Sequence, residues 1–162
     1  MIPTSAINYR HLPPPPQHQQ VATWSKVLIA QHVQLKSEIN HITALLSQPT
    51  FCIFQFDAKL RRLIKGVKTH LQLEHEFFTP VLSQLHITSN QKHRLTEGYE
   101  ALFDTCESTA KLVYSLKFTL KNTAISTSHI KEIECMFSDI RARLADEDIA
   151  YSMIDTLEEL HA

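Results

Sequence analysis

The chain has 162 residues, of which 43% are hydrophobic, and its formal net charge is −1 with the ten histidines neutral. This length and apolar content are typical of one domain with a sizeable core. Acidic and basic residues are mixed along the chain, which argues against a dedicated nucleic-acid binder, because such proteins present a basic patch or stripe. No run of 18 apolar residues is available to span a membrane.

The N-terminus lacks the continuous apolar stretch of a secretory signal. The three cysteines are an odd number without paired CxxC spacing, at positions 52, 106 and 135. Such cysteines are typical of reduced thiols, so we expect a cytoplasmic protein.

Residues 1–21 are the predicted lead-in. They include the stretch "RHLPPPPQHQQ", in which four consecutive prolines are followed by several glutamines. This composition is typical of polyproline II or disordered chain. We therefore expect a disordered Pro-rich tail, followed by a single helical domain over residues 22–162.

Four long segments in that domain carry apolar side chains at steps of three and four residues, the pattern of an amphipathic helix. They run over about 23–47, 54–85, 90–122 and 128–160. The short breaks between them, "SQPT", "HITSN" and "NTAISTS", supply helix stops and N-caps. Short connections between long helices favour antiparallel neighbours. The predicted fold is all-α, an up-down-up-down four-helix bundle.

Each apolar stripe is interrupted by polar or ionisable side chains, which would be costly to bury without partners. These residues are His32 in the first segment, His70 and Glu74 in the second, Tyr99 in the third, and Arg143 and Glu147 in the fourth. Counted from the connecting loops, they lie within about one or two helical turns of a common level. We expect them to converge inside the bundle.

Two imidazoles and a carboxylate that converge in this way suit a non-haem iron site with two histidines and one carboxylate. His70 and Glu74 are four residues apart, so both can face one ion. A metal-free network is the alternative: Arg143 would pair with Glu74 or Glu147, and Tyr99 would donate to a carboxylate.

The segments "LIAQHVQLKSEI" and "LIKGVKTHLQLEHEFFTPVL" resemble the first two helices of the hemerythrin-like (HHE) cation-binding family, the second through its HxxxE motif and its aromatic-proline end. The resemblance covers residues 22–157. It implies that His32, His70 and Glu74 are metal ligands and that Glu147 is a bridging carboxylate. The implied cofactor is non-haem iron, as one or two ions.

Two positions depart from that family pattern. Tyr99 in "EGYEALF" and Arg143 in "ARLADEDIAY" stand where the family has the histidines of its third and fourth helices. Both are therefore expected to line the cavity without binding metal. The departures favour a degenerate site, with a single iron or none, over a full di-iron centre.

The implied role is sensing or handling of oxygen, nitric oxide or iron, with a small diatomic ligand as a partner class. The alternative is a metal-free interaction module with a protein partner, since "ARLADEDIAY" also resembles the fourth helix of the Rsd-type anti-sigma regulators of transcription. No nucleophile elbow, phosphate loop or zinc-finger spacing occurs, so hydrolase or nucleotide chemistry has no support and we expect no enzyme. The mixed charge and the lack of a long apolar run predict no nucleic-acid partner and no membrane partner.

Overall fold

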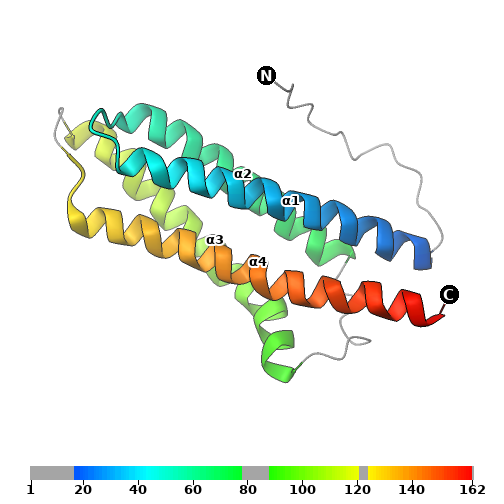
Figure 1. The fold of residues 1–162 in the computed structure, drawn as a ribbon. Helices are drawn as coiled ribbons and strands as arrows, with labels where there is room; N and C mark the ends of the chain where they lie inside the picture. Colours follow the sequence, from blue (N-terminus) through cyan, green and yellow to red (C-terminus); the bar gives the residue numbers. More distant parts are fainter. Residues whose placement is uncertain (1–16, 78–87, 121–123, 162) are drawn as a thin grey trace, which may run out of the picture.

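The computed structural model describes residues 17–77, 88–120 and 124–161, and Figure 1 shows their arrangement. Four helices account for nearly all of these residues: α1 (Gln17–Leu46), α2 (Ile53–Phe77), α3 (Ser89–Thr119) and α4 (Thr127–His161). No strand occurs in the described ranges. Successive helices run in opposite directions, so the predicted up-down-up-down four-helix bundle is confirmed (Figure 1).

The first helix is longer than the sequence indicated. It begins at Gln17, about six residues before the expected start, so residues 17–21 of the predicted lead-in are helical. Glutamine is a good helix former, whereas the four prolines that precede Gln17 cannot continue a helix. The predicted disorder of residues 1–16 lies outside the described residues. The same holds for the predicted continuation of α2 through residues 78–85.

A capping box starts α3, as the "HITSN" break predicted. The hydroxyl of Thr88 accepts a hydrogen bond from the Gln91 backbone N–H at 3.2 Å. The Gln91 side chain in turn accepts from the Thr88 backbone N–H at 3.0 Å. Two donors that would otherwise be orphaned at the helix start are thus satisfied, which fixes the point at which the chain re-enters the bundle.

The main helix contacts form a ring in which α1 packs on α2, α2 on α3, α3 on α4, and α4 on α1. The apolar core lies inside this ring and includes Leu35, Ile39, Phe56, Leu60, Leu63, Val67, Cys106, Val113, Ile133, Phe137, Ile140 and Leu144. Burying a large apolar side chain of this kind contributes about 1.5–3 kcal/mol. No helix in the described ranges is long and apolar enough to cross a membrane.

The core changes character along its length. Towards the α1–α2 and α3–α4 connections its side chains are mostly apolar, apart from the buried Asp57 and Thr109. In the half away from these connections, ionisable side chains occupy the same inward stripes. His32, His70, Glu74 and Glu147 are at most 2% exposed, and Arg143 is 7% exposed. Five of the six predicted polar residues are therefore buried in one region of the bundle, as expected.

Candidate metal centre

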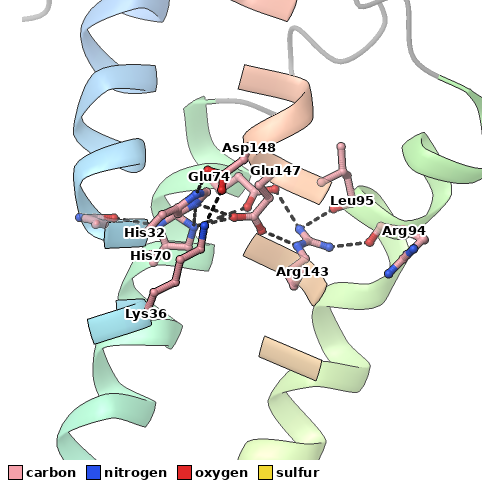
Figure 2. A network of polar contacts seen from close by, with 10 residues as sticks. His32, Lys36, His70, Glu74, Arg94, Leu95, Arg143, Glu147 and Asp148 are labelled. Carbon is pink, nitrogen blue, oxygen red and sulfur yellow. Dashed lines mark hydrogen bonds and ion pairs between the residues drawn. The ribbon is translucent and has the colours of Figure 1, made fainter. Parts of the chain in front are cut away.

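Three helices each contribute one ligand atom to a compact cluster at the centre of this polar region (Figure 2). The Nε2 atoms of His32 in α1 and His70 in α2 lie 3.0 Å apart. The Oε2 atom of Glu147 in α4 lies 2.9 Å from the former nitrogen and 2.8 Å from the latter. The three atoms form a nearly equilateral triangle.

The outward-facing nitrogens of both histidines are committed to hydrogen bonds. His32 Nδ1 lies 2.6 Å from Oδ1 of Asp148, and His70 Nδ1 lies 2.9 Å from Oε1 of Gln31. Burial alone would raise the pKa of Asp148, but hydrogen bonds from Lys36 and His32 outweigh it and lower that pKa. Asp148 is thus an acceptor at neutral pH, and both Nδ1 atoms act as donors.

A neutral imidazole that donates from Nδ1 carries a lone pair at Nε2. If both imidazoles are neutral, two such lone pairs point into the triangle, where they meet a carboxylate oxygen. A proton on either Nε2 instead makes that nitrogen a donor to Glu147 Oε2. The three atoms at 2.8–3.0 Å are thus held together either by such a proton or by a metal ion.

The size of the triangle fits a metal ion. With metal–ligand distances of about 2.1 Å, adjacent corners of an octahedron are about 3.0 Å apart, and those of a tetrahedron are about 3.4 Å apart. The observed separations of 2.8–3.0 Å match one face of an octahedron. Two histidines and a carboxylate on one octahedral face are the donor set typical of non-haem Fe(II).

Glu74 is placed beside this face but does not belong to the triangle. Its Oε2 is buried without a hydrogen-bond donor and lies 4.0 Å from His70 Nε2. A buried carboxylate oxygen without a donor is costly, so it calls for a proton or a cation nearby. Glu74 therefore lies next to the triangle, outside the group of three possible ligand atoms.

Arg143 ties the two buried glutamates together from the opposite side. Its Nε donates to Glu147 Oε1 at 2.5 Å, and its Nη2 donates to Glu74 Oε1 at 2.9 Å. Nη1 and Nη2 also donate to the backbone carbonyls of Arg94 and Leu95 in α3, at 2.5 and 2.7 Å. Burial would lower the pKa of Arg143, but the two glutamates raise it, so the guanidinium stays charged. Figure 2 draws its contacts with the glutamates and the two carbonyls.

The two glutamates have opposite pKa shifts. Burial raises the pKa of Glu74 well above its usual range, and the neighbouring Glu147 raises it further, while Arg143 only partly opposes both. Burial would also raise the pKa of Glu147, but hydrogen bonds from Glu74, His32 and His70 hold that pKa well below its usual range. Of the two glutamates, Glu147 is therefore the one whose ionised form the cluster favours.

Tyr99 is the predicted site residue that the structure does not bring into the cluster. It is half-buried, and its ring packs on Phe103 and His75 with centroids 4.5 and 5.6 Å away. Nothing in the described ranges hydrogen bonds Tyr99 to the site. The donor role expected of it belongs to Arg143, and α3 contributes two backbone carbonyls instead of a side chain.

Three residues at the site were not predicted from the sequence: Asp148, Gln31 and Tyr151. Asp148 and Gln31 each follow or precede a predicted ligand by one residue, and both lie off the apolar stripes. Tyr151 lies on the apolar stripe of the fourth segment; it is fully buried, with its ring 5.3 Å from that of His32. Its position one turn after Glu147 was the only available indication that its side chain would line the site.

Comparisons of the chain with protein-family models, with curated proteins and with solved structures found no match. The functional interpretation of the cluster therefore depends on its geometry.

Proposed function

We propose that the bundle binds one divalent transition-metal ion, with non-haem iron as the expected metal, through His32, His70 and Glu147. The observation that carries the proposal is the triangle of two Nε2 atoms and one carboxylate oxygen at 2.8–3.0 Å. Both histidines use their other nitrogens as donors, so the triangle lacks positive charge unless an ion or an added proton supplies it. Glu74 is the fourth ligand in reach.

The proposed role is sensing or handling of oxygen, nitric oxide or iron. A three-ligand face leaves coordination positions open on the metal, which is the arrangement used where iron binds small molecules. The ligand side chains are at most 2% exposed, so an organic substrate cannot reach them unless the bundle opens. A diatomic molecule is small enough to reach such a site through side-chain fluctuations. The burial thus favours a binding protein over an enzyme with a bulky substrate.

Titration of chelator-stripped protein with ferrous or cobaltous ion under anaerobic conditions tests the proposal. We expect saturation at one ion per chain, with cobalt giving a visible absorption band. His70→Ala and Glu147→Ala should abolish uptake. His75→Ala is the matched control, because His75 is an exposed histidine on the same helix, and it should leave uptake unchanged. Absence of uptake by the parent, or equal losses in the His70 and His75 variants, would contradict the proposal.

One observation favours a metal-free interaction protein as a second candidate. Arg143 already pairs with both Glu74 and Glu147, so the carboxylates have a cation without any metal. In this case a protonated His32 would lie between Asp148 and Glu147, and function would depend on the protein surface.

Unfolding in urea with and without metal separates the two candidates. A metal that binds only the folded state at 100 times its Kd adds about 2.7 kcal/mol to the free energy of unfolding. Equal unfolding curves in excess ferrous ion and in chelator would favour the metal-free candidate.

A further inference from the structure

A groove of about 800 Å³ runs between α2 and α3 on the outside of the bundle, and none of its lining residues belongs to the buried polar cluster. Cationic side chains dominate its lining: Arg61, Lys65 and Lys68 from α2, and Lys111 from α3. Ile64 and Ala110 are the apolar residues between them. Glu107 is the one anion among the lining residues, and it is paired with Lys68.

Both walls of the groove repeat at helical spacing. The α2 wall presents residues 61, 65, 68 and 72, at steps of four, three and four. The α3 wall presents residues 107, 110, 111 and 114. Steps of three and four are the pattern by which one helix offers a seam to another. At 1.5 Å per residue, the α2 wall is about 17 Å long, or three turns of a docked helix.

Exposed aromatic rings lie at one end of the groove. Tyr114, which lines it, is 47% exposed, and its neighbour Phe118 is 66% exposed. The two rings are 5.3 Å apart, and the cationic groups of Arg61 and Lys117 lie 5.1 and 4.7 Å from the Tyr114 centroid. Rings held in place by neighbouring cations are pre-organised, and large exposed aromatics typically serve as anchors in interfaces.

The positive charge of the groove indicates which class of partner can bind there. Lys65 and Lys111 are exposed and have no ion-pair partner among the described residues, although the whole chain is slightly acidic at −1. Unpaired cations beside an apolar floor are complementary to an amphipathic helix whose apolar face is flanked by carboxylates. A DNA duplex fits less well, because it is convex and has no apolar face to cover Ile64, Ala110 and Tyr114.

We infer that the α2–α3 groove is a docking site for an acidic amphipathic helix of a partner protein. The apolar face of that helix packs on Ile64, Ala110 and Tyr114, and its carboxylates pair with Lys65 and Lys111. The inference does not depend on metal binding, since no lining residue of the groove belongs to the metal cluster.

Fluorescence anisotropy with a designed peptide tests the inference on the full chain. The probe is a labelled 18-residue helix with leucines at three- and four-residue spacing and glutamates at the flanking positions. A control peptide has the same sequence with lysines in place of the glutamates. We expect saturable binding of the glutamate peptide that weakens with salt, and at least about tenfold weaker binding of the lysine peptide.

Charge reversal locates the site. The double substitution Lys65→Glu with Lys111→Glu should weaken binding of the glutamate peptide at least about tenfold and restore binding of the lysine peptide. The matched control is Lys59→Glu with Lys131→Glu, which changes the net charge equally at exposed positions outside the groove, and binding should stay within about twofold. Tyr114→Ala should weaken binding without changing its salt dependence.

Three results would overturn the inference. The first is absence of saturable binding of either peptide up to about 1 mM. The second is an equal loss of glutamate-peptide binding in the groove variant and in its control. The third is a 20-base-pair DNA duplex that binds more tightly than the glutamate peptide and depends on the same two lysines. Circular dichroism of each variant verifies that the bundle is intact.

Discussion

The Nε2 atoms of His32 and His70 lie 3.0 Å apart, although both rings use their Nδ1 atoms to donate to Asp148 and Gln31. Two neutral imidazoles oriented in this way direct lone pairs at each other, and the nearby Glu147 oxygen adds negative charge. The cluster is relieved of this repulsion either by a proton on one Nε2, which then donates to Glu147, or by a metal ion among the three atoms. The proposed function assigns a metal ion to this position.

Asp148→Ala tests whether the hydrogen bond behind His32 orients the ring for metal. Without this acceptor, His32 is free to change tautomer and to rotate, so metal affinity should fall about 10–100-fold. Glu134→Ala removes an exposed carboxylate from the same helix and should leave affinity unchanged. Competition with a chelator of known affinity gives both values. Equal affinities in the two variants would show that Asp148 does not position His32.

Arg143→Ala removes the cation that joins Glu74 to Glu147. Breaking a buried ion pair on one side leaves uncompensated charge, so the free energy of unfolding without metal should fall by about 3–5 kcal/mol. The control Arg141→Ala removes an exposed arginine two residues away, whose hydrogen bond goes to Asn40, and should cost under about 1 kcal/mol. Urea unfolding of both variants in the presence of chelator measures these changes in the free energy of unfolding. A small loss at both positions would mean that the glutamates do not need the guanidinium.

Arg143→His replaces the internal cation with a third imidazole, four residues before Glu147. A neutral ligand in place of a positive charge should raise metal affinity at least about tenfold, which corresponds to about 1.4 kcal/mol. Arg141→His, at an exposed position, is the matched control and should have no effect. Chelator competition measures the change. Unchanged or weaker binding in the Arg143 variant would show that the guanidinium does not oppose the metal.

Much of this site was predictable because each candidate ligand interrupts an apolar stripe. His32, His70, Glu74 and Glu147 stood out where only apolar side chains were expected, and all four are buried together. The metal-free alternative expected Arg143 to pair with Glu74 or Glu147, and it pairs with both. Stripe position determines which face a residue occupies, and loop lengths determine its approximate level, so residues of this kind can be placed from sequence.

The parts that could not be predicted depend on contacts that residue types do not encode. The carbonyls of Arg94 and Leu95 accept from Arg143, and any residue would offer the same acceptor. Tyr99 was placed correctly on its stripe, but its ring packs on Phe103 and not in the cluster. The start of α1 at Gln17 was missed because the glutamines there share composition with the proline stretch before them.

Asp57 lies at the end of the bundle away from the metal cluster. It contributes to the free energy of unfolding in a pH-dependent way. It is buried and bound to Arg61 and Lys117 at 3.1 and 2.7 Å. Burial alone would raise the pKa of Asp57, but these two cations outweigh it and hold the pKa below the ordinary value of 3.8. A lowered folded-state pKa stabilises the fold above the unfolded-state pKa, and the effect is lost as pH falls through the folded-state pKa.

Asp57→Asn should therefore lower the free energy of unfolding by a constant amount from neutral pH down to about pH 5, because Asp57 is ionised in both states over that range. The difference from the parent should shrink below pH 4. Asp139→Asn, at an exposed carboxylate of α4, is the control and should show little difference at any pH. Urea melts at a series of pH values measure both. A difference that grows as the pH falls would contradict the assigned pKa direction.

The most direct test of the metal centre is X-ray diffraction at the iron absorption edge, from crystals grown anaerobically with ferrous ion. The account predicts one strong anomalous peak inside the bundle, about 2.0–2.2 Å from His32 Nε2, His70 Nε2 and a Glu147 oxygen. It also predicts that this peak is absent from crystals of His70→Ala. An iron peak elsewhere, or none inside the bundle beside an intact hydrogen-bonded cluster, would contradict the account.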